Sequence, residues 1–359
     1  MRYYVLDDVV DPVRGEPLRV ADAEVLDRDG PAVERCRHWC GLLGSLPDLA
    51  TPADCQRCAR AWIHSGTLAN AAGSYPIRDG IPRFVGADDP QLDAKTQESF
   101  GFEWERFDGL LPEYATEFDN YFSIVPRSLL ADAVVLDAGC GMGRWARRVA
   151  REPVRRLYTV DFSRAIDRAA QTLADAPHAH CIQADVCHLP FRAGSMNFSY
   201  CLGVLHHLRD PDAGMRSLTR VTGGSLLLYL YYALDNRSRF HRVILAAVTV
   251  ARRLTSRLPK RIMLALAWVI AVLVYWPLAR LARLIDRAGF ARIAHEIPLS
   301  LYRSYSMRFM AGDAFDRFAT PVEGRYTRVQ IREWLGRYGY RASFSEHTPY
   351  WVTLGTPER

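Results

Sequence analysis

From Val134 onward, short apolar runs alternate with amphipathic stretches. The five apolar runs are AVVLDAG, RLYTVDFS, HCIQADV, MNFSYCLGVLHH and GSLLLYLYY. Runs of this length, rich in Val, Leu and Tyr, predict β-strands, and the stretches between them predict helices. Ser163 is placed to cap one of these helices. Strands and helices that alternate in this way predict an α/β fold with a doubly wound parallel sheet.

The C-terminal segment predicts one more helix and two more strands. Thr327 can cap a helix that ends at Gly339, and the runs RASFSEH and YWVTLG follow it. Only a turn separates these two runs. We therefore expect them to form an antiparallel hairpin at one edge of the sheet.

About ninety residues separate the fifth strand from this last helix, which is too long for an ordinary connection. The segment contains two apolar helical stretches, RVILAAVTVARRL and RIMLALAWVIAVLVYWPLARLARLI. Pro277 should interrupt the second, leaving Ile262 to Trp276, about 22 Å of helix against roughly 30 Å of hydrocarbon. We therefore predict no transmembrane span. A buried lid helix, a homodimer contact, an in-plane membrane contact and a wall for a lipid-like substrate stay open.

The N-terminal segment has a different character. Residues 1 to about 90 are rich in Pro, Gly, Asp and Cys, show little periodicity and end in SYPIRDGIPRFVG. The predicted domains are an N-terminal module (1–90), the main part of the sheet (91–232), an apolar helical insertion (233–326) and a C-terminal helix with two strands (327–359).

The composition indicates which binding partners and which cellular compartment are compatible with this chain. The chain has 359 residues, 49% of them hydrophobic, and a formal net charge of +6 that comes almost entirely from arginine. This mild excess leaves nucleic acid and anionic membranes open as partners without arguing for either. No secretory signal is visible, and four of the eight cysteines are scattered through apolar segments as reduced thiols would be. We therefore expect a cytoplasmic protein.

Three acidic residues mark the ends of the first three strands of the sheet. Asp137 precedes Gly139, Gly141 and Gly143, where bare backbone allows a tight turn and close approach of a ligand. Asp161 and Asp185 follow at equal intervals of 24 residues. In a doubly wound fold, an acid at the end of the second strand binds the ribose hydroxyls of an adenosine ligand. The third acid can accept from an adenine amino group.

These segments resemble the class I S-adenosylmethionine-dependent methyltransferases. VLDAGCGMGRWA is similar to the first motif of that family, YTVDFS to the second, QADVCHLPF to the third and YCLGVLHHLRDP to the fourth. The resemblance covers about residues 95–231 and 325–356. It implies a seven-stranded Rossmann-like sheet, six strands parallel and the last antiparallel, and S-adenosyl-L-methionine as cofactor.

The resemblance also implies which residues contact the cofactor. Turn residues would hold the methionine part, and strand-end residues the ribose and adenine. The aromatic segment FGFEW supplies a candidate cover for the cofactor in Trp104, with a plain packing role as the alternative. The expected cofactor-binding residues are Asp137, Ala138, Gly139, Cys140, Gly141, Gly143, Asp161, Phe162, Asp185, Val186, Cys201, Leu202 and Trp104.

Two further sets of residues are candidates for catalysis and acceptor binding. His206 and His207 follow the fourth strand, where a neutral imidazole could remove a proton from an acceptor hydroxyl. The alternative is that they only pack or bond to backbone. In the insertion, Tyr302, Arg303, Tyr305 and Arg308 are candidates to line the acceptor pocket. The alternative there is a surface ion-pair lattice around Asp313, Asp316, Arg317 and Glu323.

The N-terminal cysteines form two pairs, Cys36 with Cys40 and Cys55 with Cys58. Such pairs bind structural Zn2+ in zinc ribbons. YPIRDGIPRFV resembles the end of the zinc-ribbon module that is the small partner subunit of some tRNA and protein methyltransferases. The first pair has one residue too many, and ARAWIHSGTLANAAGS is inserted before this tail. Degenerate metal binding is therefore the alternative.

The sequence thus predicts a methyltransferase that acts on a small, partly hydrophobic molecule, such as a secondary metabolite, quinone or lipid-like intermediate. An oxygen acceptor is favoured over nitrogen or carbon. A tRNA, rRNA or protein acceptor is the first alternative, although no N-P-P-Y-type motif follows the fourth strand. A non-catalytic protein that binds the cofactor or a partner is the second.

Overall fold

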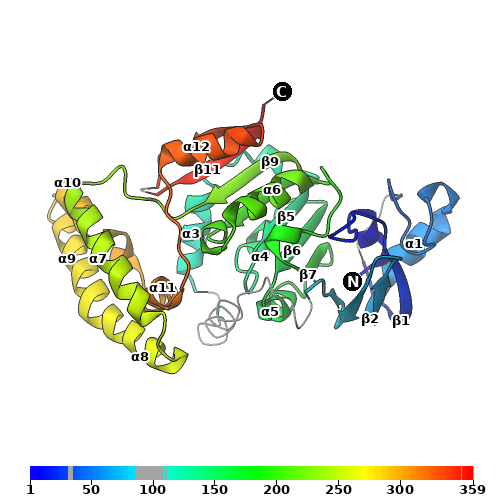
Figure 1. Ribbon diagram of the computed structural model, residues 1–359, viewed down its shortest axis with the longest axis horizontal. Coiled ribbons are helices and arrows are strands. Elements are labelled where there is room, and N and C mark those ends of the chain that lie inside the picture. Colours follow the sequence, from blue (N-terminus) through cyan, green and yellow to red (C-terminus); the bar gives the residue numbers. More distant parts are fainter. Residues whose placement is uncertain (31–34, 86–108, 110, 349, 359) are drawn as a thin grey trace. The chain divides into compact units, whose positions relative to one another are not determined.

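The computed structural model describes residues 1–30, 35–85, 109, 111–348 and 350–358 (Figure 1). The chain divides into two compact units. The first joins Met1–Gln91, Tyr121–Leu230 and Val329–Arg359, and the second joins Leu92–Asn120 and Tyr231–Arg328. Each unit has buried hydrophobic residues of its own.

A seven-stranded sheet forms the centre of the first unit. Its strands are β5 (Val134–Ala138), β6 (Arg156–Asp161), β7 (Ala179–Gln183), β8 (Met196–Leu202), β9 (Thr222–Tyr229), β10 (Tyr340–Phe344) and β11 (Val352–Pro357). Their spatial order is β10-β11-β9-β8-β5-β6-β7. Strands β5 to β9 pair in parallel, and β11 runs antiparallel to both β9 and β10. The expected mixed sheet with a C-terminal hairpin at one edge is confirmed.

The helices of this unit connect the strands. They are α4 (Ala146–Val149), α5 (Ala165–Thr172), α6 (Pro211–Val221) and α12 (Arg328–Arg337), with the short turns η3 (Arg127–Leu129), η4 (Val186–His188) and η5 (Leu205–His207). We expected a helix to follow the glycine turn after β5 and to reach about Arg151. It is only four residues long and ends at Val149. Gly141 and Gly143 have positive φ, so a right-handed helix cannot include them.

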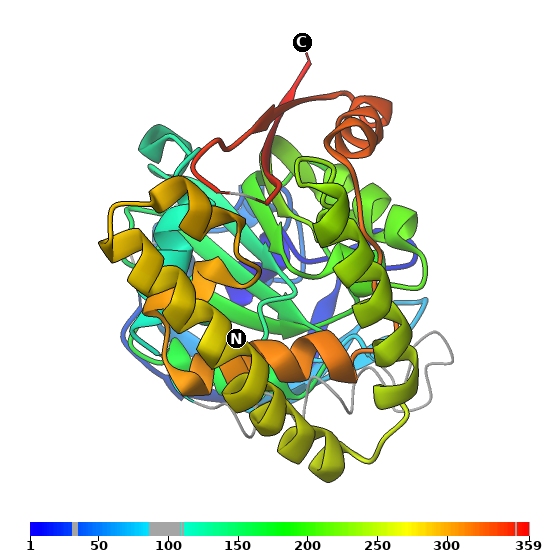
Figure 2. The same ribbon diagram turned by 90° about the vertical axis from the view of Figure 1, so that its left-hand side faces the viewer.

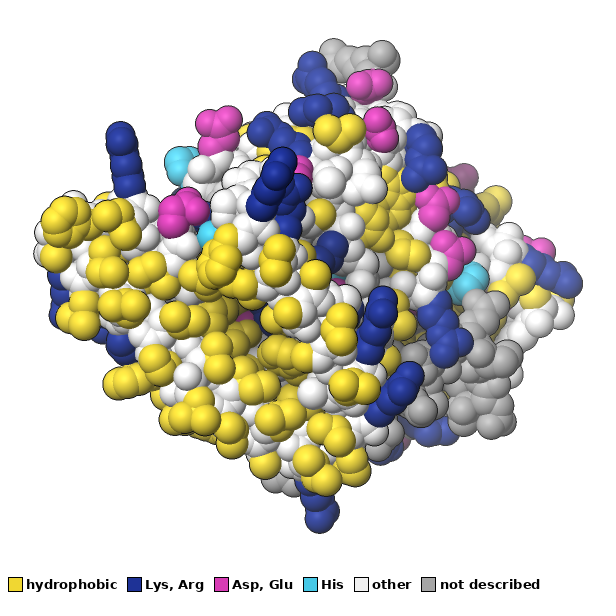
Figure 3. All heavy atoms as spheres, turned by 60° about the vertical axis from the view of Figure 1, so that its left-hand side comes forward, with side chains coloured by type: hydrophobic (Ala, Val, Ile, Leu, Met, Phe, Trp, Pro, Cys, Tyr) yellow, Lys and Arg dark blue, Asp and Glu magenta, His cyan; other side chains and the backbone are white. Residues whose placement is uncertain are grey.

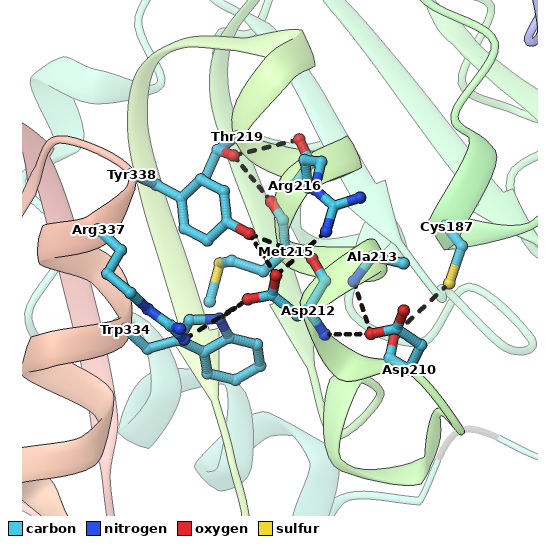
Figure 4. A network of polar contacts seen from close by, with 10 residues as sticks. All are labelled: Cys187, Asp210, Asp212, Ala213, Met215, Arg216, Thr219, Trp334, Arg337 and Tyr338. Atoms are coloured by element: carbon cyan, nitrogen blue, oxygen red, sulfur yellow. Dashed lines mark hydrogen bonds and ion pairs between the residues drawn. The ribbon is translucent and has the colours of Figure 1, made fainter.

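One carboxylate fastens α12 to α6 (Figure 4). Asp212 accepts hydrogen bonds from Trp334 Nε1 and the Tyr338 hydroxyl, both at 2.8 Å. Arg216 and Arg337 pair with the same carboxylate at 3.2 and 3.5 Å. The hydrogen bonds from Tyr338 and Trp334 hold the pKa of Asp212 below its usual value. This network ties the C-terminal segment to the helix between β8 and β9.

The N-terminal module builds a second, antiparallel sheet. Its elements are η1 (Tyr3–Asp7), β1 (Arg19–Asp27), η2 (Pro47–Leu49), α1 (Pro52–Arg60), β2 (Ala61–Ala69), β3 (Ser74–Arg78) and β4 (Ile81–Pro82). The sheet order is β1-β2-β3-β4. The segment that appeared to be an insertion before the zinc-ribbon-like tail is mostly β2, a central strand of this sheet.

Buried polar contacts join this module to the edge of the large sheet near β7. Asp8 pairs with Arg156 at 2.7 Å and accepts a hydrogen bond from the Tyr158 hydroxyl at 2.7 Å. The Tyr4 hydroxyl lies 2.9 Å from Nε2 of His180. Nearby, β4 and β7 contact each other. The module is therefore packed against the sheet and is not a loosely tethered extension.

The second unit is helical. Its elements are α3 (Glu113–Phe122, whose last two residues belong to the first unit), α7 (Arg239–Thr255), α8 (Lys260–Ile270), η6 (Ala271–Tyr275), α9 (Trp276–Arg287), α10 (Ala291–Glu296), η7 (Ser300–Ser304) and α11 (Met307–Ala319). Helix α11 contacts both α7 and α8 (Figure 2). Its buried residues Met310, Ala314 and Phe315 belong to the core of this unit.

The prediction that Pro277 interrupts the long apolar helix is wrong. Residues Lys260–Arg287 form one helix of 28 residues, long and apolar enough by length and composition to cross a membrane. The segment η6, just before the proline, is π-helical, and the Trp276 N–H donates to the carbonyl of Ala271, five residues back. Such a wider turn accommodates a proline that has no N–H to donate. The argument from helix length against a span therefore fails.

Candidate functional site

The candidate site lies in the first unit, where strands β5, β6, β7 and β8 end. Because these strands are parallel, their carboxyl ends meet at one edge of the sheet. Asp137 and Ala138 close β5, Asp161 closes β6, and Cys201 and Leu202 close β8. The remaining expected residues lie in the loops that follow these ends: Gly139, Cys140, Gly141, Gly143, Phe162, Asp185 and Val186.

The glycine turn after β5 is shaped by its backbone. Gly139, Gly141 and Gly143 have φ of +80°, +55° and +79°, a region that favours glycine. The N–H groups of Gly139 and Cys140 both donate to the Val160 carbonyl, at 2.7 and 2.9 Å. A Cβ at Gly139 would overlap the side chain of Val204, which follows β8. The turn therefore has no room for a side chain at Gly139.

Asp161 holds this turn in place. Its Oδ2 accepts from the Gly141 N–H at 2.9 Å, and its Oδ1 accepts from the N–H and hydroxyl of Ser163 at 2.9 and 2.6 Å. A carboxylate has about four acceptor positions, so about one, on Oδ2, is left for a ligand hydroxyl. Burial raises the pKa of Asp161, and the hydrogen bonds from Ser163 and Gly141 oppose that rise.

Asp137 is the most deeply buried acid of the site, with 1% of its surface exposed. Burial raises its pKa to about 8, and an interaction with the Tyr200 hydroxyl opposes the rise. Tyr200 is the residue of β8 that pairs in register with Asp137. A buried acid at the centre of the sheet is well suited to meet a positively charged ligand group, which would favour its ionised form.

Asp185 caps the short turn after β7. Its Oδ1 accepts from the Cys187 N–H at 2.9 Å, and Nδ1 of His188 lies 3.5 Å from its Oδ2. Burial alone would raise the pKa of Asp185, but the contacts with His188 and Cys187 leave it below its usual value. Val186 is buried beside it. Asp185 therefore offers an ionised carboxylate next to an apolar surface, the combination that an adenine ring requires.

The two histidines follow β8 in the turn η5. Their ring centroids are 4.2 Å apart, and the His206 ring is 6.4 Å from that of Tyr229. His206 is fully buried, and 6% of the surface of His207 is exposed. The turn belongs to the same edge of the sheet as the three acids. The structure thus brings the expected cofactor residues and the histidine pair together, apart from Trp104, which lies outside the described residues.

The four residues expected to line an acceptor pocket lie in the second unit, where the rings of Tyr302 and Tyr305 pack with their centroids 5.8 Å apart. Tyr302 is buried in the core of that unit and Arg308 is exposed. The Tyr305 hydroxyl donates to Glu117, and Arg303 pairs with Asp286 at 3.4 Å. Glu117 and Asp286, the partners of Tyr305 and Arg303, belong to the same unit.

The acids and arginines offered as a surface lattice form a partly buried network with tyrosines. The Tyr275 hydroxyl donates to Asp313 at 2.8 Å, and Arg317 pairs with the same carboxylate at 3.3 Å. Tyr231 donates to Asp316 at 2.8 Å. The fourth residue, Glu323, has only 2% of its side chain exposed and pairs with Arg252 and Arg325.

The N-terminal cysteines do not form a metal centre in the described structure. All eight cysteines lie in the described part of the chain and are free thiols. No group of three or more His, Cys, Asp or Glu side chains among the described residues is placed to hold a metal ion. Cys55 and Cys58 lie on α1, which begins with a capping box between Thr51 and Asp54, and not in a loop. The expected zinc-ribbon geometry is therefore absent from this part of the chain.

The same region nevertheless gathers the thiols. Burial, followed by the charges of Cys40 and Cys55, raises the pKa of Cys58 to about 12. The loop that carries Cys36 and Cys40 is held by Asp7, whose carboxylate accepts from the N–H groups of Arg37, His38 and Trp39 at 2.6 to 3.0 Å. The donor chemistry fits zinc, although the spacing in this structure does not.

Sequence reasoning missed two residues of the site. Tyr200 interacts with Asp137, and Val204 closes the glycine turn from the side. Both belong to the segment around the end of β8, which pairs with β5. The signal that could have found them is the strand order, since a residue two positions before the end of β8 faces the acid at the end of β5.

Part of the chain that carries this site is similar to known proteins. Residues 135–223 match the family model described as a methyltransferase domain. An uncharacterized protein of Synechococcus sp. is 32% identical over 118 residues, which are 30% of this chain and 28% of that protein. The mitochondrial arginine-hydroxylase NDUFAF5 of Danio rerio is 31% identical over 88 residues, 24% of this chain and 27% of that protein. The chain thus spans less than a third of the length of either curated relative.

The similar solved structures have low identity to this chain. The DhpI complex with SAH is 13% identical, covers 75% of this chain and 98% of its own, and has a TM-score of 0.45. The magnesium protoporphyrin IX methyltransferase of Synechocystis PCC 6803 with bound SAH is 15% identical, covers 73% of this chain and 98% of its own, and has a TM-score of 0.41.

Proposed function

We propose that the chain, whose residues 135–223 match the family model of a methyltransferase domain, transfers the methyl group of S-adenosylmethionine to an acceptor. The observation that carries the proposal is the convergence of Asp137, Asp161 and Asp185 with a glycine-rich turn at one edge of the sheet. When bound there, the cofactor would supply an activated methyl group on a sulfonium.

The residues of the chain have separate tasks in this proposal. The backbone from Gly139 to Gly143 would hold the methionine part, and Asp137 would balance its positive charge. The remaining acceptor position of Asp161 would bind a ribose hydroxyl. Asp185 would accept from the adenine amino group. Backbone at Cys201 and Leu202 and the side chains of Phe162 and Val186 complete the proposed contacts, together with Trp104.

Transfer itself asks the protein mainly to position the acceptor in line with the methyl group and to exclude water. His206 and His207 are the proposed bases for a hydroxyl acceptor. His207 retains some exposure and is the better placed of the two to reach an acceptor. His207→Gln should lower turnover at saturating cofactor, while Thr219→Ala, a change on the neighbouring helix α6, should leave it unchanged. Unchanged turnover in both His207→Gln and His206→Gln would show that neither histidine acts as the catalytic base.

We propose a small, partly hydrophobic acceptor, with oxygen favoured as the acceptor atom. The exposed apolar side chains of the second unit support this choice, and Tyr302, Arg303, Tyr305 and Arg308 stay our candidates for acceptor contacts. The test is calorimetry with S-adenosylmethionine and its demethylated product, followed by release of that product with phenols, quinols, lipids and tRNA in parallel. Cofactor binding without product release from any acceptor class would favour a non-catalytic role.

We also propose that Cys36, Cys40, Cys55 and Cys58 bind a structural zinc ion. Four thiols of this kind match the donor set of structural zinc sites, and such a site has no open position for catalysis. Metal analysis of purified protein should give about one zinc per chain, reduced in Cys55→Ser but not in Cys187→Ser. A content below about 0.2 per chain in the wild-type protein would exclude this site.

The free thiols support a reducing compartment, and we propose that the enzyme works in the cytoplasm. Cell fractionation tests this location. Recovery of the protein outside the cytoplasmic membrane would contradict it.

A further inference from the structure

The helices of the second unit expose their apolar side chains to solvent. On α7, Phe240, Val243, Val250 and Leu254 are 58–68% exposed, and they recur at spacings of three, four and seven residues. Such a spacing places them on one side of the helix. On the helix Lys260–Arg287, Leu273 is 69% and Leu284 is 63% exposed. We call this exposed surface of α7 and Lys260–Arg287 the apolar face.

The residues that the long helix buries are mostly alanines. Its buried residues recur every fourth position, at Met263, Ala267, Ala271, Tyr275 and Ala279, and pack with α11 in the core. Its most apolar window has a mean hydropathy of 2.3, yet only 28% of that window is buried. A helix in a water-soluble protein normally buries its large apolar residues. Here several large apolar residues, such as Leu273, remain outside, so this face needs an apolar environment.

Charge identifies the kind of environment. Residues 239–293 contain eleven Lys or Arg and one acid, Asp286, so this segment carries +10. The whole chain carries +6, so the rest of it is net −4. Figure 3 shows the hydrophobic side chains gathered on this face, with dark blue Lys and Arg side chains at its border. A positively charged rim around an apolar surface is complementary to an anionic lipid bilayer.

The buried polar residues decide how the long helix would lie. Tyr275 is near the midpoint of Lys260–Arg287, and its hydroxyl donates to Asp313, which also pairs with Arg317. If the helix crossed the bilayer, this acid and arginine would sit near the bilayer centre, which is costly. If the helix lies in the plane of the membrane, they stay on the protein side, away from lipid. Trp268 and Trp276, 40% and 45% exposed, are residue types that favour the membrane interface.

We propose that the apolar face docks on an anionic lipid bilayer, with α7 and Lys260–Arg287 lying in the plane of the interface. A second copy of this chain fits less well, because two positively charged segments would repel each other. The proposal does not depend on methyl transfer, and a binding assay tests it without any acceptor.

The experiment measures partitioning of the full chain onto vesicles by co-sedimentation. We expect binding to phosphatidylcholine vesicles that contain phosphatidylglycerol, and much weaker binding to phosphatidylcholine alone. Leu273→Glu/Leu284→Glu should lower partitioning at least about tenfold, because two charges would enter an apolar environment. Arg257→Ala/Arg261→Ala should lower it about 30-fold. Thermal melting of each variant checks that the fold is kept.

Matched controls change equally exposed residues elsewhere. Val13→Glu/Leu49→Glu alters side chains that are 83% and 72% exposed in the N-terminal module, and it should bind vesicles like the wild-type protein. Arg14→Ala/Arg341→Ala is the matched control for charge. Equal binding by all variants, or absence of vesicle binding together with a dimer that Leu273→Glu/Leu284→Glu dissociates, would overturn the proposal. Membrane-bound protein that resists an alkaline carbonate wash would overturn the in-plane arrangement in favour of a span.

Discussion

The N–H of Gly141 donates to Oδ2 of Asp161 at 2.9 Å, so the glycine turn after β5 and the acid at the end of β6 form one structural element. Asp161 is thus a proposed ligand for the ribose of the cofactor. It also supports the glycine turn that is proposed to hold the methionine part of the cofactor. A change at either residue should disturb both parts of the cofactor site.

Asp161→Ala should therefore weaken binding of S-adenosylmethionine by about 10- to 100-fold. The change removes a hydrogen bond to a charged acceptor and releases the N–H of Gly141. Calorimetry measures the dissociation constant, and a thermal melt reports the accompanying loss of stability. Asp175→Ala, which removes an exposed acid paired with Arg147, is the matched control and should bind the cofactor normally. Unchanged affinity in Asp161→Ala would contradict the proposed site.

Gly139→Ala should destabilise the protein by more than 1 kcal/mol and abolish cofactor binding. Its φ is +80°, and a Cβ there would overlap Val204. Gly336→Ala makes the same chemical change in helix α12, where a Cβ meets nothing within 4 Å. That variant should be more stable by about 0.5–1 kcal/mol. Urea unfolding of both proteins measures the two free energies, and a similar effect of both changes would show that the turn is not constrained.

Asp137 should make the stability of the cofactor-free protein depend on pH. Its folded pKa is raised by burial to about 8, so the folded state holds a proton that the unfolded chain releases near pH 4. The stabilisation is therefore complete below about pH 4 and is lost as the pH rises toward 8, by an amount on the order of 5 kcal/mol. Asp137→Asn should remove this slope, which urea unfolding at several pH values can detect.

The same acid should couple cofactor binding to proton release. A positive group on the ligand favours ionised Asp137, so the affinity for S-adenosylmethionine should rise between about pH 6 and 8. Calorimetry in buffers of different ionisation enthalpy counts the released protons. A pH-independent affinity, equal to that of Asp137→Asn, would exclude this coupling.

The sequence was most informative where local pattern and topology agree. The parallel strands β5 and β6 are mostly apolar, and each has an acid as its last or next-to-last residue. The strand ends at Asp137 and Asp161 could therefore be placed before the structure was known. The C-terminal hairpin could be predicted for a similar reason, because its two strands are joined by a short connection.

Features that depend on tertiary context could not be predicted. Pro277 is a helix breaker in isolation, but the π-helical turn before it lets the helix continue. The cysteine pairs indicated thiolate as the type of metal donor. They did not indicate that Cys55 and Cys58 lie on a helix. The contact of Asp8 with Arg156 joins residues 148 positions apart, and no local pattern indicates such a pair.

That buried pair gives the last prediction. Asp8 lies 2.7 Å from Arg156 and accepts from Tyr158, with side-chain exposures of only 10% and 13% for the acid and the arginine. Asp8→Ala would leave the Arg156 guanidinium buried without this partner, and unfolding free energy should fall by about 3–5 kcal/mol. The double variant Asp8→Ala/Arg156→Met removes the isolated charge as well. It should recover part of this loss, because an apolar side chain of similar length costs less to bury than an unpaired cation. Urea unfolding of the two single variants and the double variant measures the coupling. Additive effects would mean that the N-terminal module is not fastened to the sheet through this pair.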